Sequence, residues 1–158
     1  MEHWFPLGIA GLYFGCFALS IVSALVPWVN GEVLLLSLTA MAHTPFDLVV
    51  LVLLASAGQM VGKCFLYWAG RGTLKIPPGR MLSIAASWKE RLDRSPAKLL
   101  ALVFISSAVG IPPFYVITVL AGALRVKFGP FIGIGTCGRL VRFGALVTIP
   151  QFALHLVR

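Results

Sequence analysis

The fold is decided by an uncharged stretch in the second half of the chain, residues 99–124, with the sequence LLALVFISSAVGIPPFYVITVLAGAL. Its length exceeds the roughly 20 apolar residues that a helix needs to cross a bilayer core. Its middle, however, holds Gly110 and the adjacent Pro112 and Pro113. Two neighbouring prolines remove two backbone donors and end the helix that precedes them. The stretch therefore predicts two short helical limbs joined at a break, rather than one straight span.

The charges on either side of this stretch favour a hairpin that enters the membrane and turns back. The segment 71–98 before it is rich in lysine and arginine, so the positive-inside rule makes it cytoplasmic. Arg125 and Lys127 come directly after the stretch, and they return to the same side only if the hairpin is re-entrant. Apolar residues recur at helical spacing over 81–92, and charged residues of 89–94 lie mostly around the other side. This pattern indicates an amphipathic interfacial helix, basic on its wet face, with Trp88 at headgroup level. A solvated linker helix is the alternative for this segment.

The first half of the chain has the same order of parts. Residues 4–44 form the first apolar hairpin of the chain, broken at Pro27 and Gly31, and its later limb is too short to span. The hairpin 99–124 is then the second. A span over 46–70 follows, as a final span over 128–157 follows the hairpin 99–124. Paired, proline-interrupted segments in corresponding positions indicate an inverted-repeat transporter with a site near the midplane. The correspondence is one of pattern and not of residue register.

Composition excludes the common soluble classes. The 158 residues are 59% hydrophobic and 11% charged, with a mean hydropathy of +0.94, whereas a soluble domain is about a quarter charged. The net charge of +8 does not indicate nucleic-acid binding, because most basic residues lie outside the apolar runs. The cysteines and histidines have no metal-site spacing, and no nucleophile–base set indicates an enzyme. We therefore expect a membrane protein without metal, cofactor or catalysis.

Four charged residues within the apolar segments are the candidate site, namely Glu32, Lys63, Arg139 and Arg142. Such groups cost several kcal/mol in a bilayer and usually face a bundle interior, where they pair. Arg139 and Arg142 are spaced i, i+3 on one helix face, and two guanidiniums together suit a phosphate or a carboxylate. Glu32 with an arginine would form a proton- or ligand-coupled pair. A purely structural ion pair is the alternative, and snorkelling to the interface is the alternative for Lys63.

Three smaller features have structural explanations. Asp47 follows Pro45 and is most simply a helix N-terminal residue that the helix dipole stabilises. Ser106 and Ser107 precede the break at Gly110, so we expect them to hydrogen-bond the broken backbone. The glycines of the segment 58–62 are spaced as in a small-xxx-small helix-packing face.

Taken together, these motifs resemble the DedA family, also called VTT-domain or SNARE-associated-Golgi-type membrane proteins. The likeness covers about residues 20–145 and rests on the segments Pro27–Leu35, Gly58–Lys63, Tyr67–Arg71, Gly110–Phe114, Leu120–Leu124 and Gly138–Phe143. The chain departs from the family pattern at Lys63, where an aspartate is usual. It also lacks the arginines that typical members carry around the second-hairpin proline.

The resemblance implies an all-α polytopic membrane protein with two facing re-entrant hairpins, in a bacterial plasma membrane. It implies a transporter or scramblase that moves a phospholipid or polyprenyl phosphate between leaflets. Arg139 and Arg142 would hold the phosphate, Glu32 would cycle a proton, and Lys63 would lie on the pathway. The alternatives are a proton- or small-solute-coupled secondary transporter and a non-transporting membrane scaffold. A chain of 17.0 kDa is small for enclosing a transport pathway on its own. Two copies could enclose one together, so a homodimer is compatible with either kind of transport.

Overall fold

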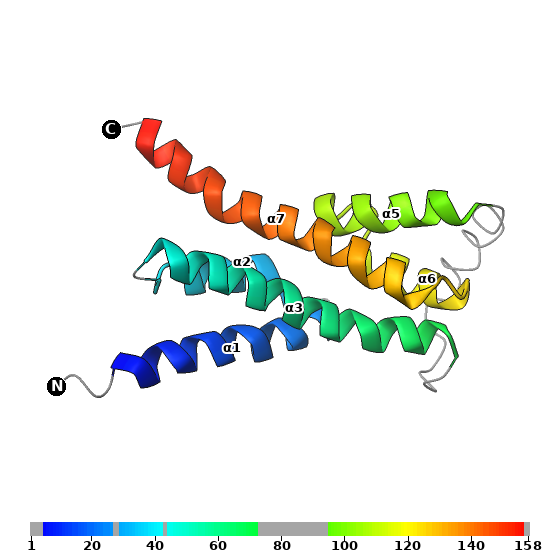
Figure 1. Cartoon of the computed structure of the whole chain (residues 1–158), viewed down its shortest axis with the longest axis horizontal. Helices are drawn as coiled ribbons and strands as arrows, with labels where there is room; N and C mark the ends of the chain where they lie inside the picture. Colours follow the sequence, from blue (N-terminus) through cyan, green and yellow to red (C-terminus); the bar gives the residue numbers. More distant parts are fainter. Residues whose placement is uncertain (1–4, 27–28, 43, 73–94, 157–158) are drawn as a thin grey trace. The chain divides into compact units, whose positions relative to one another are not determined.

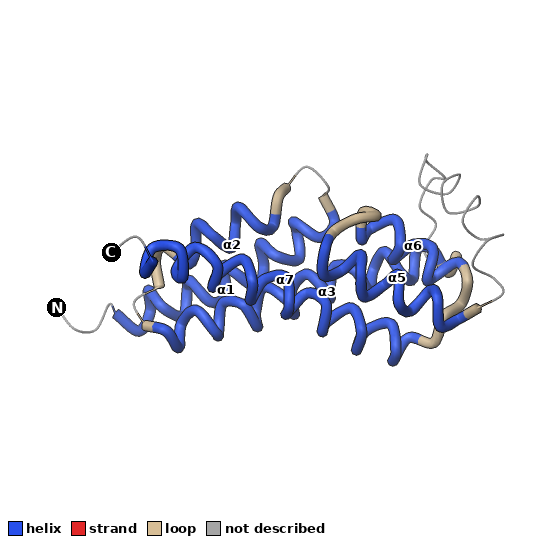
Figure 2. The backbone as a smooth tube through the Cα atoms, turned by 90° about the horizontal axis from the view of Figure 1, so that it is seen from above, coloured by secondary structure: helices blue, strands red, loops and turns tan. Residues whose placement is uncertain are grey.

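The computed structural model describes residues 5–26, 29–42, 44–72 and 95–156, and within these ranges it contains helices and loops but no strand (Figures 1 and 2). The helices are α1 (Phe5–Leu25), α2 (Gly31–Thr39), α3 (Pro45–Gly70), α5 (Pro96–Val109), α6 (Phe114–Ala123) and α7 (Phe128–Leu156). By length and composition, α1, α3 and α7 can cross a membrane, whereas α2, α5 and α6 are too short. The predicted all-helical class is thereby confirmed.

The chain divides into two compact units, one of which is made of two separate stretches of sequence. Unit 1 comprises Met1–Gly62 with Leu140–Arg158, and unit 2 comprises Lys63–Arg139. Each unit therefore holds one pair of broken helices, one part of α3 and one part of α7. A helix of 26 residues is about 39 Å long, so its two parts can bury their side chains in different units. The predicted inversion of one half of the chain relative to the other stays a prediction.

The core of unit 1 draws on all four of its helical segments. It is formed by the buried side chains of Cys16, Leu35, Leu51, Ala55, Phe143 and Val147. Helix α1 runs beside the first half of α3 (Figure 1). A Cβ added at Gly58 would lie 2.6 Å from the Phe17 carbonyl oxygen, and one at Gly62 would lie 2.5 Å from the Ala24 Cβ. The predicted small-residue packing face at 58–62 is therefore confirmed.

The break in unit 1 lies between the end of α1 and the start of α2. Pro27, predicted as part of this break, lies outside the described residues. Helix α2 begins at Gly31, and the Asn30 side chain caps it by accepting a hydrogen bond of 3.0 Å from the Glu32 amide. Its nine residues span about 14 Å, less than half a bilayer core. The prediction of a limb too short to span is confirmed, whereas re-entry of this hairpin stays a prediction.

The break in unit 2 is closed by backbone geometry and one hydroxyl group. Helix α5 ends at Gly110, whose φ of +89° is a left-handed conformation that suits glycine. The Ser106 hydroxyl donates to the Pro112 carbonyl oxygen at 2.5 Å, and α6 begins after Pro113 and packs against α5. The prediction that Ser106 bonds the broken backbone is confirmed. The hydroxyl of Ser107 instead donates to the Phe104 carbonyl within α5.

Most predicted segment boundaries hold to within a few residues. The span predicted over 46–70 is α3, and the span predicted over 128–157 is α7. The second hairpin begins at Pro96 and not at residue 99, because proline suits the first turn of a helix. Residues 73–94, with the predicted amphipathic helix and Trp88, lie outside the described residues. The cytoplasmic position of 71–98 stays a prediction.

Asp47 is a structural residue at the start of α3, as expected. Its carboxylate accepts a hydrogen bond from the Thr44 amide at 2.9 Å, and the Thr44 hydroxyl accepts one from the Asp47 amide at 3.2 Å. This reciprocal pair is a capping box. Tyr13 of α1 also donates its hydroxyl to the same carboxylate at 2.6 Å, which ties α1 to the start of α3.

Candidate functional site

The four charged residues predicted as the site are divided between the two units. Glu32 and Arg142 belong to unit 1, and Lys63 and Arg139 belong to unit 2. Arg139 and Arg142 lie one turn apart on α7, yet the unit boundary falls between them, after Arg139. The geometry therefore describes two separate charged groups.

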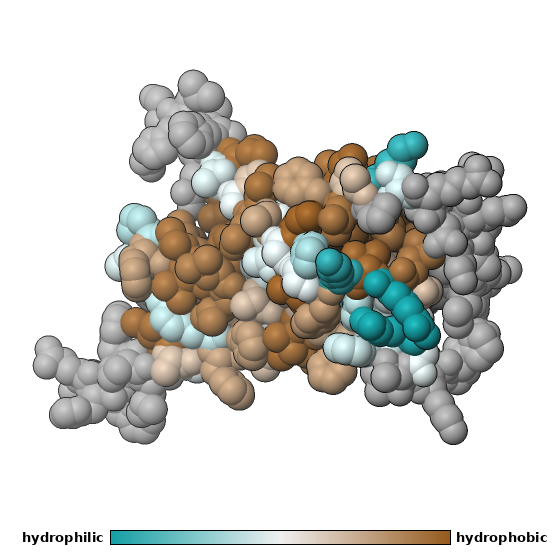
Figure 3. Space-filling view, turned by 45° about the vertical axis from the view of Figure 1, so that its right-hand side comes forward, coloured by the Kyte–Doolittle hydropathy of each residue, from teal (hydrophilic) through white to brown (hydrophobic). Residues whose placement is uncertain are grey.

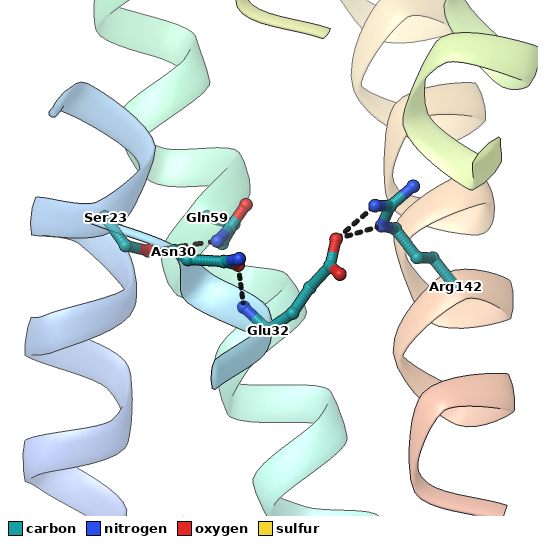
Figure 4. Close-up of polar contacts among 5 residues, drawn as sticks. All are labelled: Ser23, Asn30, Glu32, Gln59 and Arg142. Carbon is teal, nitrogen blue, oxygen red and sulfur yellow. Dashed lines mark hydrogen bonds and ion pairs between the residues drawn. The ribbon is translucent and has the colours of Figure 1, made fainter. Parts of the chain in front are cut away.

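Within unit 1, Arg142 and Glu32 form an ion pair between α7 and α2 (Figure 4). Arg142 donates from Nε to Glu32 Oε1 at 2.7 Å, and its Nη2 contacts the same oxygen. The side chains keep 23% and 32% of their surface exposed, so the pair is accessible and not sealed in a core. Arg142 lies about 21 Å along α7 from Phe128, well inside the apolar part of that helix.

Uncharged polar side chains lie around the first turn of α2, beside the ion pair. Figure 4 shows Asn30 capping the helix end that carries Glu32, while Gln59 of α3 donates to the Ser23 hydroxyl of α1 at 3.0 Å. A Cβ at Gly31 would collide with the Gln59 amide and would lie 3.0 Å from the Ser23 oxygen. A larger residue at position 31 would therefore have to displace the Gln59 side chain from its place beside Ser23.

Sequence reasoning did not single out Ser23, Asn30 and Gln59. Their signal was weak, because each is a single uncharged polar residue in or beside an apolar run. A buried amide such as Gln59, which is 5% exposed, needs hydrogen-bond partners, and that requirement is the clue that was available. Sequence reasoning also left open which arginine pairs with Glu32. Within unit 1 the partner is Arg142.

The arrangement in unit 1 can exchange one anion for another. A guanidinium binds carboxylate and phosphate oxygens with the same donor fork, so a phosphate can take the place of the Glu32 carboxylate. The first turn of α2 also favours negative charge, because helix N-termini carry partial positive charge. The partial exposure of both side chains leaves a route for such an exchange.

Unit 2 holds two cations near the second hairpin. Lys63 is buried, with 5% of its surface exposed, which argues against a side chain that snorkels to the interface. The Arg139 guanidinium carbon lies 4.9 Å from the centre of the Phe114 ring, a cation–π contact at the first residue of α6. The charges of Lys63 and Arg139 interact electrostatically.

The described residues form three apolar helices of spanning length, interrupted helix pairs and charged groups inside helices. These features define an integral membrane protein of the polytopic helical class. The surface visible in Figure 3 is mostly hydrophobic, as a lipid-facing surface requires. The family model of the VTT domain matches residues 26–152, which include the four candidate site residues, Glu32, Lys63, Arg139 and Arg142. The chain therefore belongs to the VTT-domain family, the DedA and SNARE-associated Golgi proteins. No curated protein and no solved structure matches the chain.

Proposed function

We propose that this protein moves a phosphate-bearing lipid, a phospholipid or a polyprenyl phosphate, between the leaflets of its membrane. The observation that carries the proposal is the Glu32–Arg142 ion pair, which lies on apolar helices and remains about a quarter to a third exposed. A partly exposed ion pair contributes little to stability, so stability alone does not explain two charges on apolar helices. Membership of the VTT-domain family supports a membrane function but does not define the cargo.

In the proposed mechanism the headgroup phosphate competes with Glu32 for Arg142. At rest the carboxylate occupies the guanidinium fork, which keeps the cation from being left without a counter-charge. When a phosphate arrives, it replaces the carboxylate, and proton uptake by Glu32 would favour this exchange. Arg139, the second guanidinium predicted for the headgroup, belongs to unit 2, and the exchange described here involves residues of unit 1 alone. The acyl chains remain in contact with the exposed apolar side chains of the helices.

The experiment is a lipid-translocation assay in liposomes that contain a trace of fluorescent phospholipid. Wild-type protein is expected to expose inner-leaflet label to an external quencher faster than protein-free vesicles. Arg142→Ala should slow this rate at least tenfold, and Arg142→Lys should recover only part of it, because an ammonium lacks the planar fork. Thr148→Ala is the matched control on α7, since its hydroxyl bonds the Gly144 carbonyl of its own helix at 2.8 Å.

The alternatives give different results in the same vesicles. If Arg142→Ala folds and still moves lipid at the wild-type rate, the ion pair is structural and the proposal is wrong. Proton flux that needs Glu32, without lipid movement, would favour a proton- or solute-coupled secondary transporter. If the protein shows neither lipid movement nor proton flux, the result would favour a membrane scaffold that uses the segment 71–98 as its interaction surface.

We also propose a bacterial plasma membrane as the location, with the segment 71–98 on the cytoplasmic side. The excess of lysine and arginine in that segment supports this orientation. Cysteines introduced at positions 80 and 126 should react with an impermeant reagent from the same side. Labelling from opposite sides would mean that the hairpin 99–124 crosses the membrane. A homodimer, which would enlarge the wall around the pathway, would be detected by cross-linking in the membrane.

A further inference from the structure

The end of α3 is bonded to the turn between α6 and α7 within unit 2. The Tyr67 hydroxyl donates to the Val126 carbonyl oxygen, and Arg71 donates from Nη1 to the Tyr67 oxygen at 3.1 Å. Tyr67 itself is fully buried, and its ring stacks on Phe131 with 5.0 Å between the ring centres. Arg71 is therefore held beside the turn that carries residues 125–127.

This junction gathers positive charge without a carboxylate among the described residues. Arg71, Arg125 and Lys127 are all exposed, and we call these three side chains the Arg71 cluster. In the parts of unit 2 that the structure describes, residues 63–72 and 95–139, no aspartate or glutamate occurs. Among the described residues of unit 2, the Arg71 cluster thus forms a positive surface that can bind an anionic group.

The Arg71 cluster lies at the expected level of lipid headgroups. The apolar part of α3 ends at Gly70 and that of α7 begins at Phe128, so the cluster occupies the membrane–water boundary of both helices. Trp68 and Phe128 flank it, with 5.6 Å between their ring centres and about a third of each side chain exposed. Tryptophan is enriched at this boundary. The Arg71 guanidinium carbon lies 5.5 Å from the centre of the Trp68 ring, which restricts its position.

Arg125 occupies a backbone position that normally belongs to glycine. Its φ is +53°, and its amide bonds the Gly122 carbonyl while the Val126 amide bonds the Ala121 carbonyl, both at 3.0 Å. These two bonds form the Schellman motif that ends α6, in which the left-handed position usually holds glycine. A cation elsewhere in the last turn of α6 would interact with the helix dipole equally favourably. The strained position therefore indicates that the arginine side chain is used here.

We propose that the Arg71 cluster binds the phosphate of a resident anionic phospholipid in the adjacent leaflet. The three cations supply the charge, Trp68 and Phe128 set the depth, and the exposed apolar surface beside them contacts the acyl chains. The bound lipid joins the end of α3 to the α6–α7 turn and stabilises unit 2. This inference does not depend on transport, because the Glu32–Arg142 pair belongs to the other unit.

The test measures thermal unfolding of the full chain in a neutral detergent with added lipid. Phosphatidylglycerol micelles should raise the unfolding temperature more than phosphatidylcholine micelles, and inorganic phosphate should have no effect. Removing one cation, by Arg71→Gln or Lys127→Gln, should weaken the apparent affinity for phosphatidylglycerol about fivefold, since each interfacial cation contributes about a factor of five. Lys98→Gln is the matched control, an exposed cation of the same unit on α5.

Arg125→Gly separates the lipid site from a structural role. Glycine relieves the left-handed strain, so the variant should unfold without lipid at the wild-type temperature or above it. It should nevertheless lose most of the shift that phosphatidylglycerol causes. The proposal is overturned if Arg125→Gly keeps the full shift, or if Lys98→Gln loses as much of it as the cluster variants. Equal stabilisation by phosphatidylcholine or by inorganic phosphate also overturns it.

Discussion

Units 1 and 2 contain the same kinds of parts but differ in charge. Each has a pair of broken helices, a part of α3 and a part of α7. Among the described residues of unit 1, the charged side chains are Glu32, Asp47 and Arg142. Those of unit 2 are all cations, namely Lys63, Arg71, Lys98, Arg125, Lys127 and Arg139. The architecture therefore tolerates opposite charge patterns, and charge distinguishes what each unit can bind.

Close helix packing at glycine is what the two units share. In unit 1, Gly58 lets α3 approach the Phe17 carbonyl of α1. In unit 2, Gly122 of α6 lies against the Tyr67 carbonyl of α3, and Gly138 of α7 lies against Ser107 of α5. Lipid tails are as apolar as the helix surfaces, so association in a membrane depends on such close contact more than on the hydrophobic effect.

The largest expected effect is that of Gly122→Ala. The added Cβ would collide with the Tyr67 carbonyl oxygen, a backbone atom that cannot rotate away. We expect a loss of about 3 kcal/mol or more in the free energy of unfolding, at the upper end for an overpacked core. Gly133→Ala is the control, because nothing lies within 4 Å of its Cβ position. It should be neutral or more stable by up to about 1 kcal/mol, as alanine favours helix.

The same comparison applies to unit 1. Gly58→Ala should be destabilising but milder, since its nearest neighbour, the Phe17 carbonyl oxygen, would lie 2.6 Å away. Gly11→Ala on α1 is its neutral control, with nothing within 4 Å. Denaturation in detergent measures all four variants. If Gly122→Ala is as stable as Gly133→Ala, close glycine packing does not hold unit 2 together.

The next largest effect concerns the Glu32–Arg142 ion pair of unit 1. Exposed ion pairs contribute less than about 1 kcal/mol and breaking enclosed ones costs about 3–5 kcal/mol, and the Glu32–Arg142 pair is intermediate in burial. We therefore expect a coupling energy of about 1–2 kcal/mol in a double-mutant cycle of Glu32→Gln and Arg142→Gln. Stability in detergent and lipid movement in liposomes are both measured for the wild type, the two single variants and the double variant.

The two measurements distinguish function from structure. If the double variant regains stability but not lipid movement, the charges handle cargo as proposed. If it regains both, the pair only holds α2 to α7. A coupling energy near zero would mean that the contact adds nothing to the stability of unit 1.

Much of the fold was predictable because its signals are local. The break at Gly110 and Pro112, the short limbs and the span 46–70 follow from proline, glycine and segment length alone. The partner of Glu32 was not predictable, since Arg139 and Arg142 share a helix face and only the rotation of α7 against α2 selects one. The Tyr67–Val126 bond joins residues 59 apart and leaves no pattern in the sequence. The division of α3 and α7 between units is equally non-local.

The smallest expected effects concern the two breaks, which the units close by different means. In unit 2 the fully buried Ser106 hydroxyl donates to the Pro112 carbonyl at 2.5 Å. Ser106→Ala removes a buried partner from that carbonyl, so we expect a loss of about 1–2 kcal/mol in the free energy of unfolding.

In unit 1 the exposed Asn30 caps α2. Asn30→Ala should cost about 0.5–1 kcal/mol, because water can replace part of the cap. Ser37→Ala is the control for both, an exposed hydroxyl that bonds only the Val33 carbonyl of its own helix at 2.8 Å, and should change stability by less than about 0.5 kcal/mol. Chemical denaturation in detergent ranks the three. An Asn30→Ala loss that equals or exceeds that of Ser106→Ala would mean that burial of the hydroxyl does not set the strength of the second break.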